Sequence, residues 1–369
     1  VPDLVELLSG AMSGSELTSV LLAVSSKRAG KAAGVFPQHL LSNYRSVPAL
    51  APSRVPFARL REIQSVAFAA ASDFEPIELS PVQPFGLNRA TGIHQNNVVS
   101  TVRPWELLAD PTSQLALEAA ERRSADRFQT VRLCACARVM RLQPTQVKGY
   151  GPHFRMFGLV SAGRATADEA FERDELSRHA IIVVRMLREL GVRVLRVELS
   201  DARATLALLA TAGLGSEDVR TAVRTHRPNS GPDLLAQRGV QLPLLEGDMG
   251  AALSGLPLTS ELRSRLVRMH ERTAMPLAAH LGIPVHVEVS RLHGLGYYES
   301  WQLGIVVGDD AGEATIADGG VVTWTQSMLS DRKERLVTSG VGVEYLGSRF
   351  VIAPSRAGSD RSFSPIPAR

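Results

Sequence analysis

"VRLCACARVMRL" (131–142) and "HFRMFGLVSAG" (153–163) are the two stretches that decide the fold. The first alternates in polarity as a half-buried β-strand does, and the second reads as another strand. The glycine-containing turn "KGYGP" lies between them, so we predict an antiparallel hairpin with a long loop. Cys134 and Cys136 are two apart and face one side of the first strand, and no second cysteine pair completes a zinc site. We expect two buried thiols.

The rest of the chain supplies further strand pairs and blocks of helix, which favours an α+β fold with an antiparallel sheet flanked by helices. The proline-rich stretch at 46–57 marks a boundary. We therefore predict a helical N-terminal extension over 1–50 and a main domain over 51–353. The main domain carries a variable insertion around 200–260, and residues 354–369 form a flexible tail.

The composition is that of a globular protein with a sizeable core. Of the 369 residues, 44% are hydrophobic and 21% are charged. The sequence has no apolar run of membrane-spanning length and no visible signal peptide, so a cytoplasmic location is expected. The net charge of +4 is spread over scattered arginines, which permits nucleic-acid binding without arguing for it. Rossmann, P-loop, zinc-protease and nucleophile-elbow motifs are absent from the sequence.

Five short segments, in serial order, resemble the catalytic domain of a class II aminoacyl-tRNA synthetase of the histidyl type, over roughly 57–350. The first is "ASDFEPIELSPV" (71–82), which resembles motif 1, a helix followed by a strand that ends at a proline, here Pro81. In the family this segment forms the dimer interface. The resemblance therefore implies a homodimer, although an ordinary helix–strand unit has the same pattern.

The second segment is "LLADPT" (107–112). It resembles the family's L-R-P-E-G-T, whose acid and threonine hold the α-amino group of the substrate, and Asp110 and Thr112 take those places. A carboxylate and a hydroxyl suit the donors of an ammonium group. The alternative is that Asp110 caps the following helix, with Pro111 at its first position.

The third segment is the hairpin itself, which resembles motif 2. Arg141 in "VMR" matches the family's arginine for the α-phosphate of ATP. On the second strand, His153 and Arg155 are polar residues that the family does not have at those positions. The resemblance implies that they line a rebuilt substrate pocket.

The fourth segment is "HGLGYY" (293–298), beside the family's R-G-L-D-Y-Y. His293 stands where the family has the arginine that activates the substrate carboxylate, and Gly296 replaces the aspartate. Tyr297 and Tyr298 remain. Adjacent positions of a strand face opposite ways, so we expect at most one of these tyrosines to line the pocket.

The fifth segment resembles motif 3. "ADGGVVTW" (317–324) keeps Gly319 and Gly320 of the substrate-binding glycine pair, and "GVGVEYL" (340–346) keeps Glu344. Tyr345 replaces the arginine that stacks on adenine, and tyrosine has neither its charge nor its fork. Loss of such a cation typically costs several kcal/mol of transition-state stabilisation.

These departures set the functional expectations. Histidine adenylation by the family's own mechanism is not expected. After about residue 350 too little chain remains for the family's anticodon-binding module, so tRNA charging is not expected either. The first hypothesis is a histidyl synthetase-like paralogue that binds a small amino compound, with ATP and Mg²⁺ if it is an adenylating enzyme; no resident metal is expected.

Two other functions stay open. The resemblance extends to the histidyl synthetase-like regulatory subunit of ATP phosphoribosyltransferase, which implies a non-catalytic role with a protein partner. The basic composition and the helical extension leave a nucleic-acid-binding role as a third, weaker alternative.

Overall fold

The fold is seen in a computed structural model that describes residues 2–34, 37–142, 151–215, 237, 239, 249–289 and 291–350. The predicted tail at 354–369 and part of the predicted insertion lie outside these residues. Among the helices of the described part, none combines the length and apolar character that crossing a membrane requires.

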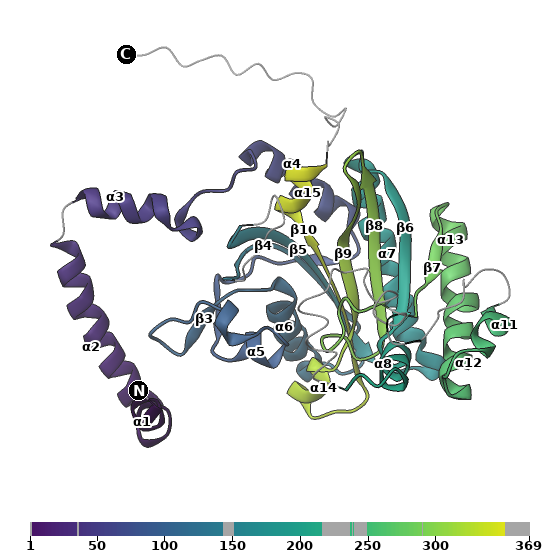
Figure 1. Ribbon diagram of the computed structural model, residues 1–369, viewed down its shortest axis with the longest axis horizontal. Coiled ribbons are helices and arrows are strands. Elements are labelled where there is room, and N and C mark those ends of the chain that lie inside the picture. The colour runs from purple at the N-terminus through teal and green to yellow at the C-terminus, as the bar shows by residue number, and fades with distance from the viewer. Residues whose placement is uncertain are drawn as a thin grey trace, which may run out of the picture.

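One eight-stranded sheet organises the chain (Figure 1). The predicted hairpin is confirmed, with β4 and β5 paired antiparallel from Val131–Ala162 to Met140–His153. The sheet is nevertheless mixed, because both edge strands run parallel to their neighbours. In spatial order the strands are β1 (Glu75–Pro76), β4 (Val131–Met140), β5 (His153–Arg164), β10 (Glu334–Gly342), β9 (Gly312–Val322), β8 (Trp301–Asp309), β6 (Val194–Asp201) and β7 (Val285–Val287).

Helices cover both faces of this sheet. On one face α4 and α7 pack together over the central strands, and the largest apolar cluster fills the space beneath them. The other face is covered by α6 and α14, above a second apolar cluster that includes Leu115 and Trp324. The bounds are α4 (Phe57–Ala70), α6 (Pro111–Ala125), α7 (Ala170–Glu189) and α14 (Trp324–Leu329).

Smaller elements complete the main body. A two-stranded ribbon, β2 with β3, lies beside α5 near the start of α6, and α15 follows β10 directly. Both cysteines are buried, free thiols on β4, as expected. The remaining bounds are β2 (Val82–Pro84), β3 (Trp105–Leu107), α5 (Leu87–Ala90), α8 (Ala202–Thr211), α11 (Met249–Ser254), α12 (Ser260–Met269), α13 (Met275–Leu281) and α15 (Val343–Arg349).

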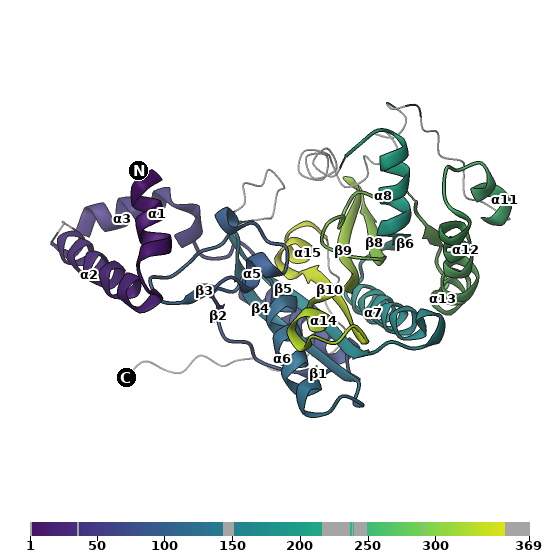
Figure 2. The ribbon, with the colours of Figure 1, turned by 90° about the horizontal axis from the view of Figure 1, so that it is seen from below.

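Residues 2–34 and 37–50 are mainly helical and stand away from the sheet (Figures 1 and 2). We call residues 2–34 and 37–50 the N-terminal arm. Ser13 and Glu16 form a capping box at the start of its longest helix. Its elements are α1 (Pro2–Glu6), a π-helical turn (Leu7–Ala11), α2 (Gly14–Ala33), α3 (Pro37–Ser46) and a 3₁₀ turn (Pro48–Leu50).

Candidate functional site

A cavity of about 730 Å³ opens on the α6 face of the sheet. That volume is the size of a small-molecule site. The segments that meet there are the start of α6, the loop after α5, the 293–298 turn, and the middle of strands β5, β9 and β10. Its polar lining consists of Arg89, His94, Asn97, Asp110, Thr112, Arg141, His293, Tyr297, Tyr298, Asp318, Thr338 and Ser339.

The start of α6 builds one wall. Asp110 is the N-cap, as its alternative reading predicted, and its Oδ1 accepts hydrogen bonds from the backbone N–H of Thr112 at 2.9 Å and from its hydroxyl at 2.7 Å. Arg141 donates from Nη2 to the other carboxylate oxygen at 2.7 Å and from Nε to the Ala109 carbonyl at 2.6 Å. The predicted amine-binding acid and the predicted phosphate-binding arginine are therefore neighbours that pair with each other.

The 293–298 segment forms a turn, so the prediction that at most one tyrosine reaches the pocket is wrong. Gly294 and Gly296 adopt φ of +85° and +80°, which favours glycine, and the backbone N–H groups of Tyr297 and Tyr298 both donate to the Gly294 carbonyl. Both rings line the cavity and meet edge to face, with centroids 4.9 Å apart. Strand alternation does not apply within a turn.

The tyrosine hydroxyls stay neutral. Burial raises the pKa of Tyr297 well above its usual value, and the nearby Asp110 carboxylate raises it further. Burial and Asp318 raise the pKa of Tyr298 in the same way. The hydroxyl of Tyr297 lies 3.4 Å from Thr112 Oγ1. Both rings therefore present un-ionised phenols near the carboxylates at neutral pH.

His293 and Asp318 also line the cavity. Nδ1 of His293 lies 3.2 Å from Oδ2 of Asp318 without hydrogen-bond alignment, and it has no hydrogen-bond partner among the described residues. Asp318 was missed in the sequence, although it directly precedes the predicted glycine pair. Gly319 and Gly320 lie behind the lining: a Cβ on Gly320 would come within 2.7 Å of the Tyr298 ring, so this glycine makes room for the tyrosine.

The remaining predicted residues lie outside the cavity lining. His153 contacts Arg138 through Nδ1 at 2.7 Å and the Ala51 carbonyl through Nε2 at 2.7 Å. Arg155 donates to Gln64 at 2.9 Å. These side chains hold the start of the main body and do not reach the cavity, so the expectation that they line a rebuilt pocket is not met.

The motif 3 residues are also engaged elsewhere. Glu344 is buried and pairs with Arg138 at 2.9 Å. Tyr345 is buried, its ring packs edge to face on Phe350, and its hydroxyl accepts from Arg349 at 2.6 Å. Tyr345 is not among the residues that line the cavity, whereas Arg141 lines it with its guanidinium paired to Asp110. The described residues contain no cluster of three or more His, Cys, Asp or Glu side chains suited to a metal ion.

Residues 89–97 contribute a part of the cavity lining that was not predicted from the sequence. Arg89, His94 and Asn97 lie in or after the short helix α5. Arg89 is exposed, and its side chain makes no hydrogen bond or ion pair within the described part of the chain. The polar stretch "TGIHQNN" (91–97), which contains Gly92 at φ +95°, was the available signal.

Comparison with known proteins gives the fold a name. No protein-family profile and no curated protein matches the sequence. Solved structures do match: an ATP phosphoribosyltransferase regulatory subunit/histidyl-tRNA synthetase from Bacillus halodurans aligns at 14% identity and TM-score 0.61 over 81% of this chain and 82% of its own.

Two further structures agree. A histidine–tRNA ligase subunit from Alicyclobacillus acidocaldarius aligns at 19% identity and TM-score 0.59, over 82% of this chain and 95% of its own. Histidyl-tRNA synthetase from Nostoc sp. PCC 7120 aligns at 16% identity and TM-score 0.60, over 82% and 74%. The chain therefore has the α+β fold of histidyl-tRNA synthetase and of this synthetase-like regulatory subunit.

Proposed function

We propose that the cavity binds a small molecule that carries a protonated amino group. The observation that carries the proposal is the convergence of two carboxylates, Asp110 and Asp318, with two un-ionised tyrosines around one cavity of ligand size. An ammonium group offers three donors, and carboxylate and phenol oxygens accept them. The position of Asp110 and Thr112 also agrees with the resemblance to the amine-binding segment.

Asp318 is the more available acceptor of the two. The Asp110 carboxylate already accepts from Thr112 and Arg141, whereas the Asp318 carboxylate has only the close contact with His293 at 3.2 Å among the described side chains. Arg89 also lines the cavity, and its guanidinium has no hydrogen-bond or ion-pair partner among the described residues. The two groups offer an acceptor for an ammonium group and a donor for a carboxylate, so we infer a zwitterionic ligand such as an α-amino acid or a close analogue.

Activation of that ligand by ATP with Mg²⁺ is the less favoured part of the proposal. The arginine for the α-phosphate is held by Asp110, and the residue at the adenine-stacking position is a buried tyrosine. Such a site would bind an amino compound without adenylating it and without charging tRNA. ATP–pyrophosphate exchange tests this directly, and exchange with any amino acid would contradict it.

A non-catalytic regulatory subunit is the second candidate. The observation that favours it is that Tyr345, at the adenine-stacking position, contacts Arg349 and Phe350 and lies outside the cavity lining. The Bacillus halodurans neighbour is an ATP phosphoribosyltransferase regulatory subunit/histidyl-tRNA synthetase. Co-purification with ATP phosphoribosyltransferase, and a change in that enzyme's activity on addition of this chain, would support this candidate.

A homodimer through the segment 71–82 belongs to the same proposal. Among the strands of the described residues, its β1 lies at the edge of the sheet and pairs with β4 alone. Light scattering that shows a monomer would contradict this.

The binding proposal is tested by calorimetric titration with L-amino acids, histidine included, and with their deaminated analogues. Binding of an amino compound but not of its deaminated analogue is expected. Asp318→Asn keeps the shape of the side chain and removes its charge, and we expect it to weaken binding by roughly tenfold or more. Glu313→Gln, on β9 but outside the cavity lining, is the matched control and should leave the affinity unchanged.

A further inference from the structure

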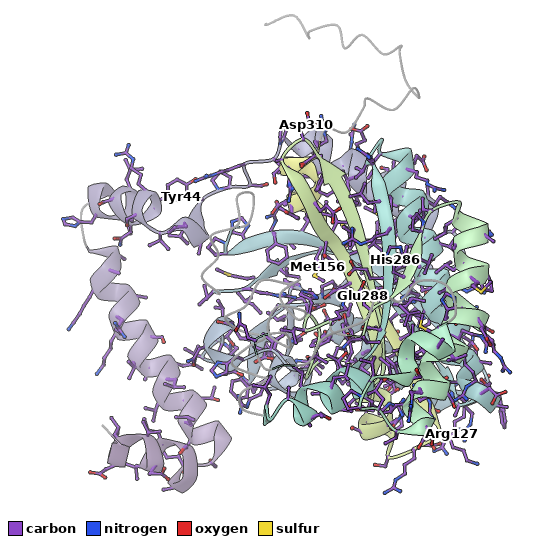
Figure 3. The ribbon with its side chains drawn as sticks, turned by 45° about the vertical axis from the view of Figure 1, so that its right-hand side comes forward. Tyr44, Arg127, Met156, His286, Glu288 and Asp310 are labelled. Atoms are coloured by element: carbon purple, nitrogen blue, oxygen red, sulfur yellow. The ribbon has the colours of Figure 1, made fainter. Side chains whose placement is uncertain are left out.

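The N-terminal arm leaves an apolar surface uncovered. Ten of its large hydrophobic side chains are exposed, and none of its residues described at side-chain level is buried. Figure 3 shows Tyr44 on α3, well separated from the sheet residues Met156 and His286. The exposed side chains are Leu4, Val5, Leu7, Val20, Val24, Leu40, Leu41, Tyr44, Val47 and Leu50.

The chain's own main body does not cover this surface. No helix of the arm packs extensively on the sheet or on the helices that flank it, within the described residues. The root of the arm is fixed, because the Ala51 carbonyl contacts His153 Nε2 at 2.7 Å and Val55 is buried in the main core. From that root the arm leads outward in both views (Figures 1 and 2). Among the described residues of the main body, none therefore serves as a partner for this surface.

Helix α2 presents the most regular part of the uncovered surface. Leu17, Val20, Leu21 and Val24 follow the i, i+3, i+4, i+7 spacing of one helix face, on which Leu17 and Leu21 are half-buried and the two valines are exposed. Val20 is 41% exposed and Val24 is 47% exposed. Most of the stability of a helix in a protein comes from tertiary packing, and α2, although capped, has no buried residue. Packing this stripe against a partner would stabilise the helix.

The charges along α2 identify the partner. Its first turn carries Glu16, and its second half carries Lys27, Arg28 and Lys31. In an antiparallel pair of α2 helices centred on Leu22, Glu16 of one copy stands level with Arg28 of the other. The same pairing opposes the two helix dipoles. We propose that the N-terminal arm binds the arm of a second copy of this chain through such an antiparallel α2 pair.

This pairing also packs the apolar face of α2 in one copy against the apolar face of α2 in the other. Val20 of one copy stands level with Val24 of the other, twice over because the contact is two-fold symmetric. A lipid surface fits α2 less well, since the helix contains no aromatic residue and its polar face consists mainly of serine and threonine. The face of one 30 Å helix is smaller than a standard interface, so we expect contributions from the exposed Leu40 and Tyr44 of α3.

Disulfide cross-linking of the full chain tests the contact itself. In Val20→Cys/Val24→Cys, mild oxidation is expected to link two copies, because the two thiols face each other across the pair. The matched control is Ser19→Cys/Ser26→Cys, at nearly the same level on the opposite face of α2. The native cysteines are buried and do not interfere. No dimer band, or bands of equal strength from the two variants, would overturn the proposal.

The antiparallel register of the α2 pair is tested by reversing one charge in the Val20→Cys/Val24→Cys variant. Arg28→Glu brings like charges level at both ends of the pair, and we expect it to slow cross-linking roughly tenfold. Arg45→Glu, outside α2, carries the same charge change and should leave the rate unaltered. An unaltered rate with Arg28→Glu, or flotation of the wild-type chain as a monomer with anionic vesicles, would contradict the antiparallel pair.

Discussion

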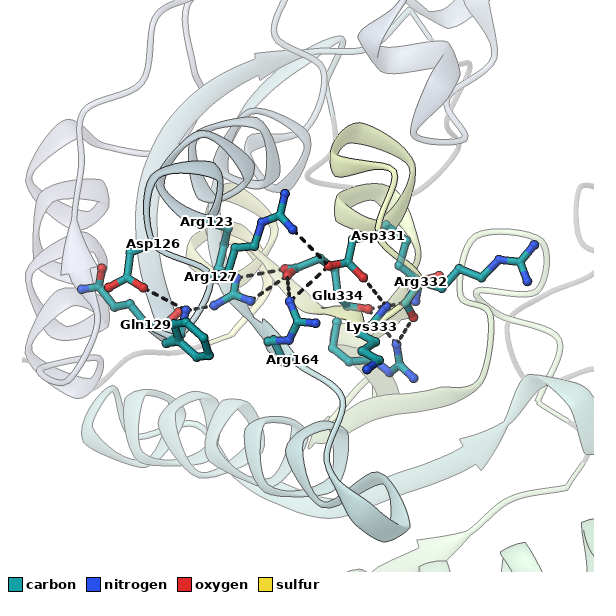
Figure 4. Close-up of polar contacts among 12 residues, drawn as sticks. Arg123, Asp126, Arg127, Gln129, Arg164, Asp331, Arg332, Lys333 and Glu334 are labelled. Atoms are coloured by element: carbon teal, nitrogen blue, oxygen red, sulfur yellow. Dashed lines mark hydrogen bonds and ion pairs between the residues drawn. The ribbon is translucent and has the colours of Figure 1, made fainter.

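Removing one partner of a buried ion pair should destabilise the packing between the sheet and the helix that begins at the candidate site. Arg123, near the end of α6, and Glu334, at the start of β10, are each 1% exposed at the side chain. The guanidinium donates to both carboxylate oxygens, at 2.9 and 2.7 Å, and to the Gln129 carbonyl at 2.5 Å (Figure 4). This contact joins α6, whose N-cap is Asp110, to the sheet.

Glu334→Leu leaves the Arg123 guanidinium buried with only a carbonyl as partner. Loss of one member of a buried pair typically costs about 3–5 kcal/mol of stability, because the remaining charge stays desolvated. Arg164, which also lies within 3.6 Å of Glu334, still has Asp331 at 3.1 Å, so it adds little to this cost. We expect the free energy of unfolding to fall by about 3–5 kcal/mol.

The double variant Arg123→Met/Glu334→Leu separates this cause from simple loss of packing. It removes both charges and keeps apolar volume, so it should recover most of the stability that Glu334→Leu loses. Guanidinium chloride unfolding, followed by circular dichroism for the four members of the cycle, provides the measurement. A Glu334→Leu cost below about 1 kcal/mol, or a double variant no more stable than the single one, would refute the reasoning.

Three further predictions follow from buried groups. His179 is fully buried, and burial lowers its pKa to about 4. In the unfolded chain the imidazole of His179 takes up a proton below about pH 6.5, whereas in the folded chain it does so only near pH 4. The free energy of unfolding should therefore fall by about 3 kcal/mol as the pH drops from 6.5 to 4, and by less in His179→Gln. An equal pH dependence in the two proteins would contradict this prediction. Gly320→Ala places a methyl group 2.6 Å from the Trp301 carbonyl and should cost about 1–3 kcal/mol in a thermal melt; no loss would contradict this. Burial raises the pKa of Cys134 to about 12 and of Cys136 to about 11, so iodoacetamide should label them only after unfolding, as mass spectrometry would show.

Local patterns predicted much of the fold. Alternation found the β4–β5 hairpin, and Asp110 followed by Pro111 marked the start of α6. The two parallel pairings at the edges of the sheet were not predicted, because β1 and β7 have two and three residues, too few to show a pattern.

The site was predicted only in part, for a geometric reason. Asp110, Arg141 and His293 do line one cavity, but sequence does not reveal that Asp110 and Arg141 pair with each other. His153 points toward the root of the arm, because its ring nitrogens contact Arg138 and Ala51 there. Such contacts join residues far apart in the chain, and neither spacing nor composition encodes them.

The measurement that tests the central claim most directly is calorimetric titration of wild type and Asp318→Asn with one amino acid and its deaminated analogue. The account predicts that wild type binds the amino acid alone and that Asp318→Asn binds it at least roughly tenfold more weakly. Equal binding of both compounds, or an affinity unchanged by Asp318→Asn, would contradict an amine site built on the carboxylates of this cavity.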